Sequence, residues 1–238
     1  MGAKIYQNKK YIAFFLIPAF VFMLIFLYYP FIQNIINSFQ HIKYMGTAAD
    51  KWNAPFYKNY LEIFKDPKML IALKNTGIMI IATIVGEVGL AIVLSLLVSN
   101  IKKGAGFFRV VYFFPIVISA TALGLLFNLV FLYDKGMINQ LLQLIGVLDA
   151  GKNELIDWKA THPMFTMLVP VIWQYVGFYF IILLTGLSGI PEDLYEAAEI
   201  DGASKLQQVR YVTLPLLRNS ICTCVVLAVT GALKVFDL

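Results

Sequence analysis

Long hydrophobic runs dominate the chain, and charged residues collect between them. Four runs reach the length of about 20 apolar residues that a helix needs to cross a bilayer. They are Tyr11–Ile32, Asn75–Val98, Val110–Tyr133 and Pro163–Leu187, and only the second contains a charge, at Glu87. This pattern predicts an all-α, polytopic membrane protein.

A fifth, shorter run begins near Ile221. The 15 residues from Ile221 to Val235 are short for a full crossing, and Lys234 and Asp237 interrupt them near the end of the sequence. We expect a fifth span over about 219–238, and we expect the sequence to end inside or just beyond it. The chain then has five recognisable spans.

Composition supports the membrane assignment. Of the 238 residues, 60% are hydrophobic and 14% are charged, whereas soluble domains have about 45–50% and about 25%. The net charge of +5 fits loops beside anionic headgroups, so membrane lipid is expected as a partner and nucleic acid is not. The first run is longer than the apolar core of a signal peptide, which predicts an uncleaved first span.

Charge gives a weak indication of orientation. Lys and Arg are equally numerous on the two sides of the predicted spans, but 100–109 has three positive charges and no acid. The first span usually dominates, and Lys4, Lys9 and Lys10 precede it. We therefore expect residues 1–10 and residues 188–218 to lie in the cytoplasm, in a multi-pass protein of the inner membrane. The outer segment 40–70 contains Trp52, Tyr57 and Asp66-Pro67, which suggest a folded cap rather than a slack tether.

Residues 188–217, here called the charged module, are the most polar helix-forming stretch. Pro191 suits a first helical turn, and the acids that follow it favour the positive end of the helix dipole. Gly202 is expected to break this helix, because glycine adopts positive φ without a steric penalty. Ser204 is then the predicted N-cap of a second helix, about Lys205–Val212, and Pro215 marks the start of the next span.

The first helix of the charged module has a narrow apolar stripe of Ile190, Leu194, Ala197 and Ala198. Its small alanines would let the backbone of another protein approach closely. The alternative is an amphipathic helix lying on the headgroups. The five acids of residues 192–201 disfavour that alternative, because anionic membranes prefer Lys and Arg.

Glu196-Ala197-Ala198, then Gly202, then Val212-Thr213-Leu214-Pro215 resemble the EAA motif of permease subunits in binding-protein-dependent ABC importers. Val212 stands where isoleucine is usual. Further pairs are similar to the carbohydrate-uptake branch, specifically the subunit type exemplified by the first maltose permease. These pairs include Tyr29-Pro30, Asn59-Tyr60, Asn75-Thr76, Trp173 with Gly177, and Ile190-Pro191.

The resemblance implies a permease for a sugar or sugar-like solute, with residues 11–238 as its transmembrane domain and 188–218 as its coupling loop. It implies a second homologous permease, an ATPase pair that binds the ATP, and an extracellular solute-binding protein as partners. The family core has six spans, so the resemblance implies either that the sequence is incomplete or that it describes only part of a functional subunit. The residues that it assigns to ATPase coupling are Glu196, Ala197, Ala198, Glu199, Asp201, Gly202, Leu214 and Pro215.

Other chemistries find little support in the sequence. There is no glycine-rich phosphate loop, and no spacing of His41 or His162 suggests a metal site or catalysis. Cys222 and Cys224, two apart on a helix, point to different faces and are expected to serve packing. We predict no catalytic residue, no metal and no cofactor in this chain.

Glu87 supports the stronger rival, an ion-coupled transporter or channel, because an acid within a span is by default a functional hypothesis. Gly86 and Gly89 beside it equally suggest close helix packing, in which Glu87 serves structure. Both interpretations stay open at this point. For the substrate pathway, the polar or amphipathic candidates within spans are Glu87, Asn128, Gln174 and Tyr175.

Overall fold

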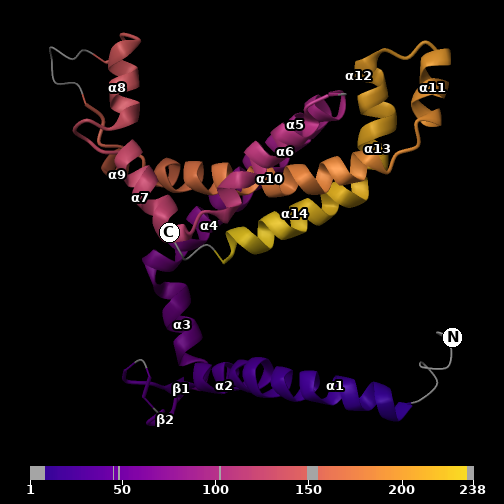
Figure 1. Ribbon diagram of the computed structural model, residues 1–238. Coiled ribbons are helices and arrows are strands. Elements are labelled where there is room, and N and C mark those ends of the chain that lie inside the picture. Colours follow the sequence, from indigo (N-terminus) through magenta and orange to yellow (C-terminus); the bar gives the residue numbers. More distant parts are fainter. Residues whose placement is uncertain (1–8, 45, 48, 102, 149–154, 235–238) are drawn as a thin grey trace. The chain divides into compact units, whose positions relative to one another are not determined.

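The computed structural model describes residues 9–44, 46–47, 49–101, 103–148 and 155–234. Residues 1–8, most of the predicted cytoplasmic N-terminus, and the last four residues lie outside this description. The chain divides after Ala72 into two compact units. Apart from a two-stranded hairpin, the described elements are helices, as the hydrophobic pattern predicted (Figure 1).

The first unit begins with a long apolar helix and continues into a folded segment. Helix α1 (Lys9–Met23) passes through a π-helical turn (Leu24–Tyr28) into α2 (Tyr29–Ser38). Strands β1 (Gln40–His41) and β2 (Lys51–Trp52) then pair antiparallel, and α3 (Lys58–Lys65) follows. The Asn59 amide donates to the carbonyl oxygens of Ser38 and Gln40 at 2.9 and 3.1 Å, which holds α3 against the end of α2. The prediction that this segment is folded is confirmed, and its position on the outer side stays a prediction.

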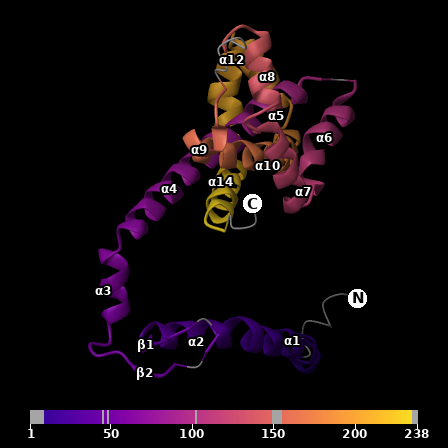
Figure 2. The same cartoon turned by 90° about the vertical axis from the view of Figure 1, so that its left-hand side faces the viewer.

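The second unit is organised around one long helix, α10 (Pro163–Ser188). It packs against α5 (Leu90–Ser99), α6 (Ala105–Phe113), α14 (Arg218–Ala232) and the π-helical turn η3 (Ile84–Gly89), which joins α4 (Pro67–Thr83) to α5. Figure 2 shows α5, α10 and α14 gathered in one bundle. Short helices α7 (Ala120–Val130), α8 (Met137–Leu144) and α9 (Trp158–Thr161) precede α10.

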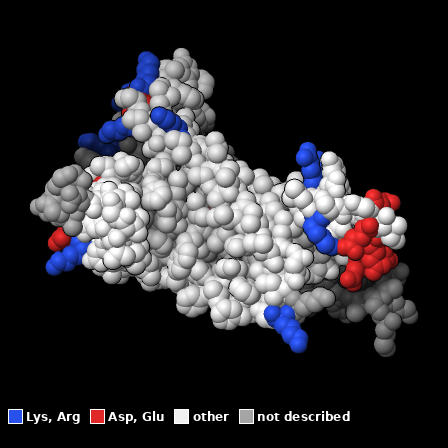
Figure 3. Space-filling model, turned by 90° about the horizontal axis from the view of Figure 1, so that it is seen from above, with Lys and Arg blue, Asp and Glu red and all other residues white. Residues whose placement is uncertain are grey.

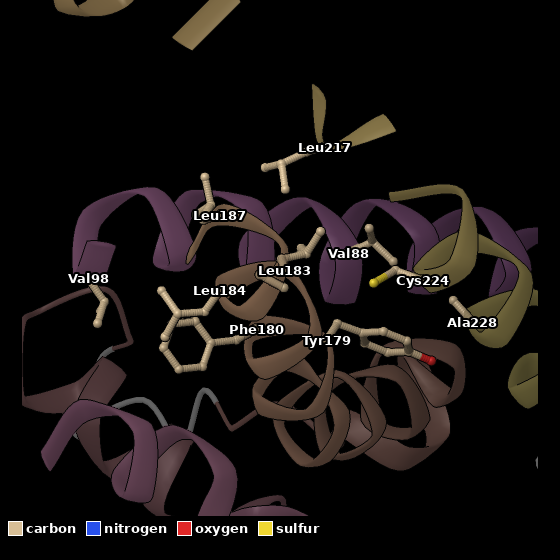
Figure 4. Close-up of a cluster of buried hydrophobic side chains, with 11 residues drawn as sticks. Val88, Val98, Tyr179, Phe180, Leu183, Leu184, Leu187, Leu217, Cys224 and Ala228 are labelled. Atoms are coloured by element: carbon tan, nitrogen blue, oxygen red, sulfur yellow. The ribbon is translucent and has the colours of Figure 1, made fainter. Parts of the chain in front are cut away.

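The core of the second unit is a cluster of buried apolar side chains between these helices (Figure 4). Phe180, Leu183, Leu184 and Leu187 of α10 cluster with Val88 and Ala91 and with Leu217. Burial of such side chains contributes about 1.5–3 kcal/mol each in water, but in a bilayer close packing replaces much of that driving force. Cys224 is buried in this cluster whereas Cys222 is exposed, so the two cysteines do point to different faces.

Three described helices are long and apolar enough to cross a membrane: Tyr11–Ser38, Pro67–Ser99 and Pro163–Ser188. They contain the first, second and fourth predicted runs. Among the described residues the number rises to five if each of two bent helix pairs forms one span. The prediction of five spans therefore stays a prediction.

The third predicted run, Val110–Tyr133, is not one continuous helix. The segment Ala105–Val117 is followed by Ala120–Val130 at an angle of 98°. Pro115 lies in the 3₁₀ turn Phe114–Val117, and Ser119 has an extended backbone and caps α7 by accepting from the Ala122 N–H at 3.3 Å. A proline followed by a serine N-cap ends one helix and starts another.

The predicted fifth span also has a bend at its start. The segment Lys205–Leu216 meets α14 at 67°, with Leu217 at the corner. Helix α14 (Arg218–Ala232) begins one residue before the expected span of about 219–238. Pro215 lies just before the corner, close to where the sequence placed the change of helix.

Candidate functional site

The charged module folds as the sequence predicted, into two helices joined by a glycine turn. Helix α11 (Asp193–Ile200) ends at Asp201, and Gly202 has a φ of +78°. Ser204 caps α12 (Lys205–Gln208): its side chain accepts from the Gln207 N–H while the Gln207 side chain accepts from the Ser204 N–H. This reciprocal capping box fixes where the second helix begins.

The second helix of the charged module extends further than predicted. After α12 the chain passes through a π-helical turn, η6 (Val209–Thr213), and α13 (Leu214–Leu216) before it reaches the corner at Leu217. Leu214 and Pro215 therefore lie in α13, at the junction with α14, and not on α11 with the other motif residues. The motif residues occupy both ends of the module.

Helix α11 presents acids to solvent. Glu192, Asp193, Glu196, Glu199 and Asp201 are all exposed, and Figure 3 shows a patch of acidic side chains over this part of the molecule. Ala197 is exposed beside them, while Ala198 and Tyr195 are half-buried on the inner face. Lys205 pairs with Glu199, and this hydrogen bond, with a second from Gln208, lowers the pKa of the Glu199 carboxyl below its ordinary value. Lys205 and Gln208 thus stabilise the charged form of the Glu199 carboxyl.

The inner face of the module carries contacts that the sequence reasoning did not find. The Tyr195 hydroxyl lies 3.1 Å from Thr213 Oγ1, and Thr213 is 2% exposed. The Gln208 side chain donates to the Ala203 carbonyl oxygen at 3.4 Å. The signal available in the sequence was the i, i+3 spacing of Tyr195 and Ala198, which places both on the side opposite Glu196.

A separate cavity of about 450 Å³ lies between η3, α10 and α14. It brings together three of the four substrate-pathway candidates: Glu87, Gln174 and Tyr175. Hydroxyl groups of Thr83, Tyr179 and Thr230 add to the lining. Amide, carboxyl, hydroxyl and aromatic groups around one space are suited to a polar organic solute.

The fourth candidate, Asn128, is elsewhere. It is exposed on α7, where its side-chain oxygen accepts a hydrogen bond from Lys159. Gln174 has a structural contact of its own: its Nε2 donates to the Ile118 carbonyl oxygen at 3.0 Å, at the break between α6 and α7. The Gln174 side chain therefore links the lining of the cavity to the bend in the predicted third span.

Glu87 lies on η3 and is 3% exposed. Its carboxyl group interacts with the Tyr179 hydroxyl of α10, and both residues line the cavity. A Cβ on Gly86 would come within 2.6 Å of the Ile172 side chain, so the expectation of close packing at Gly86 is confirmed. At Gly89 nothing lies within 4 Å of the position that a Cβ would take, so the expectation of close packing is wrong at Gly89.

Comparison with known proteins decides the family. Residues 88–238 match the model of the binding-protein-dependent transport system inner membrane component. The probable ABC transporter permease protein YurN of Bacillus subtilis is 35% identical over 233 residues, which cover 97% of this chain and 78% of YurN. This chain is a binding-protein-dependent ABC transporter permease. It is a multi-pass transport protein of the inner membrane and not an enzyme.

Two further similarities extend over nearly the whole permease. The arabinooligosaccharides transport system permease protein AraP of Halalkalibacterium halodurans is 32% identical over 238 residues, covering 98% of this chain and 71% of AraP. A solved bacterial alginate ABC transporter, in complex with an alginate pentasaccharide-bound periplasmic protein, matches with a TM-score of 0.79 at 23% identity. That match covers 98% of this chain and 75% of the other, and it establishes the shared fold.

The contact between Glu87 and Tyr179 gives a prediction for the permease. Glu87→Leu removes the partner of a buried tyrosine hydroxyl, and an unsatisfied buried polar group costs about 1–3 kcal/mol. We expect Glu87→Leu to lower the thermal stability of the purified transporter, while Glu87→Gln, which still hydrogen-bonds, stays close to the native value. Val85→Leu on the same turn, where Val85 is exposed, is the matched control. Native stability in Glu87→Leu would show that Glu87 has no structural role.

Proposed function

We propose that this permease moves a sugar or oligosaccharide from a solute-binding protein into the cytoplasm, in a complex with a second homologous permease and an ATPase pair. AraP is named for arabinooligosaccharide transport, and the similar solved transporter imports alginate. Both relatives act on carbohydrates built of several sugar units. The cavity residues Glu87, Gln174 and Tyr175 are proposed to line the solute path, and Asn128 stays a prediction outside this cavity.

The observation that carries the proposal is the geometry of the charged module. An exposed acidic helix, a left-handed glycine turn and a capped second helix lead into α14. Glu196, Ala197 and Glu199 form the outer surface that is proposed to meet the ATPase, and Ala198 lies half-buried behind them on the inner face. Movement of α11 with the ATPase would reach the helices around the cavity through α12 and α13, and alternate the access of the cavity between the two sides of the membrane.

The energy source of uptake tests this function. In membrane vesicles that contain the complete transporter, uptake of a labelled oligosaccharide bound by the cognate binding protein is expected to require ATP on the cytoplasmic side. It is expected to persist when ionophores collapse the ion gradients. Replacing the phosphate-loop lysine of the ATPase is the control and abolishes uptake. Uptake that follows an ion gradient without ATP would support the ion-coupled alternative with Glu87 as the carrier group.

Orientation is the second part of the proposal: the N-terminus and residues 188–218 are in the cytoplasm. Single cysteines at Glu192 and Lys159, in a Cys222→Ser, Cys224→Ala background, are treated in intact cells with an impermeant thiol reagent. We expect labelling at position 159 in intact cells and at position 192 only after permeabilisation. The reverse pattern contradicts this topology.

A further inference from the structure

Within the charged module, α11 is tied to the second helix by a short chain of hydroxyl contacts. The Tyr195 hydroxyl lies 3.1 Å from Thr213 Oγ1, and the Thr213 hydroxyl in turn donates to the Gln208 carbonyl oxygen at 3.4 Å. The Tyr195 hydroxyl can donate to Thr213 Oγ1 while the Thr213 proton is directed to Gln208. Both groups are shielded: Thr213 is 2% exposed, and Tyr195 is half-buried on an otherwise mostly exposed helix.

From Thr213 the path to the core is short. The Leu217 N–H donates to the Thr213 carbonyl oxygen at 2.9 Å, and the Leu217 side chain is 1% exposed within the core cluster of the second unit. Leu217 is also the corner at which the chain turns into α14. A displacement of α11 at Tyr195 is therefore passed to Leu217 through two hydrogen bonds, the Tyr195–Thr213 contact and the bond from the Leu217 N–H to the Thr213 carbonyl oxygen.

Gln208 of α12 also interacts with Glu199 of α11, and the remaining connections between the two helices of the module are exposed or local. The pair of Glu199 and Lys205 is exposed on both sides, and exposed ion pairs contribute little in water. The turn Asp201-Gly202 is closed by local backbone hydrogen bonds, from the Gly202 N–H to the Glu199 carbonyl oxygen at 3.0 Å and from the Ala203 N–H to the Ala198 carbonyl oxygen at 2.9 Å. These bonds do not reach η6. The Tyr195–Thr213 contact is the shielded connection between α11 and the end of η6.

We propose that Tyr195 and Thr213 are positioning residues that transmit movement of α11 to α14, and this rests on the proposed role of α11 in docking the ATPase. With the bond in place, α11, η6 and Leu217 move together. Without it, α11 follows the ATPase while α14 lags, so ATP is hydrolysed with less transport. The bond lies on the inner face of α11, away from Glu196 and Ala197, so its loss is expected to leave ATPase association unchanged.

The test uses the complete transporter reconstituted with its binding protein, and it measures solute transported per ATP hydrolysed. Tyr195→Phe and Thr213→Val each remove a hydroxyl with little change in shape. Each is expected to lower the transport-to-hydrolysis ratio about 5- to 10-fold, a typical size for coupling between two sites. The double variant is expected to be no worse than the more impaired single variant, because both remove the same bond.

Two controls separate transmission from a general structural effect. Thr213→Ser keeps the hydroxyl and is expected to restore most of the ratio, and Tyr211→Phe removes the hydroxyl of a mainly exposed tyrosine in η6 and is expected to be neutral. An unchanged ratio in Tyr195→Phe, additive losses in the double variant, or a loss of membrane abundance that accounts for the loss of uptake would each overturn the proposal.

The same assay distinguishes failure of this inference from failure of the proposed function. Gly202→Asp acts at the turn and at the docking surface and does not depend on the Tyr195–Thr213 bond. If Gly202→Asp uncouples the transporter and Tyr195→Phe does not, the inference is wrong and the coupling role of the charged module stands. If neither variant changes the ratio, the coupling role itself is wrong.

Discussion

Gly202→Asp is expected to lower uptake about 100-fold while the permease remains in the membrane at normal abundance. Gly202 has a φ of +78°, a conformation that costs most side chains about 1–2 kcal/mol and that Asp and Asn both tolerate better than other residues. The new carboxylate would also lie beside Asp201 and near Glu199 on the surface that is proposed to meet the ATPase. A few kcal/mol of difference between docked and undocked states shifts a conformational equilibrium by two orders of magnitude or more.

The space around Gly202 can accommodate a side chain, because nothing lies within 4 Å of the position that a Cβ would take. The variant is therefore expected to fold, and the defect to arise at the protein contact. Gly202→Asn is the matched control: asparagine has nearly the same shape, tolerates positive φ and adds no charge. We expect it to lose no more than a few-fold in uptake. Normal uptake and normal ATPase stimulation in Gly202→Asp would mean that the turn is not a coupling element.

Gly177→Ala is expected to remove most of the folded permease from the membrane. Gly177 lies on α10 where that helix crosses α6, and a Cβ there would overlap the backbone carbonyl oxygen of Tyr112 and lie 2.9 Å from the Phe113 nitrogen. Backbone atoms cannot rotate away as a flexible side chain can. The helices must separate, and overpacking of this kind costs about 3 kcal/mol or more.

Membrane abundance and the thermal stability of the purified complex measure this effect. Gly124→Ala on α7 is the matched control, because nothing lies within 4 Å of its Cβ position and alanine is the better helix former. It is expected to equal or exceed the native stability. Native abundance in Gly177→Ala would show that α6 and α10 are further apart than the structure has them.

Local signals in the sequence were sufficient to predict the charged module. The helix break at Gly202 and the cap at Ser204 depend on residues within a few positions of each other, and both are confirmed. The fourth run was predicted as Pro163–Leu187 and is a helix from Pro163 to Ser188. An uncharged apolar run of this length is long enough to cross a bilayer as a single helix.

Contacts between distant segments could not be predicted in the same way. The partner of Glu87 is Tyr179, on a helix about 90 residues away, and nothing in the spacing of either residue indicates the other. The break in the third run was missed because Pro115 and Ser119 lie within an uncharged run that hydrophobicity alone treats as continuous. Proline followed by a serine cap was the signal that could have found it.

Cross-linking from α11 tests the central claim, that this helix docks the ATPase, most directly. In one variant, a single cysteine replaces the exposed Ala197 in a Cys222→Ser, Cys224→Ala background. In a separate control variant of the same background, the cysteine replaces Leu144 of α8, which is 84% exposed and lies outside the charged module. In the assembled transporter we expect a bifunctional thiol reagent to join position 197 to the ATPase, with a yield that changes when ATP binds, and not to join position 144. A cross-link from position 144, or none from position 197 in any nucleotide state, would contradict the account.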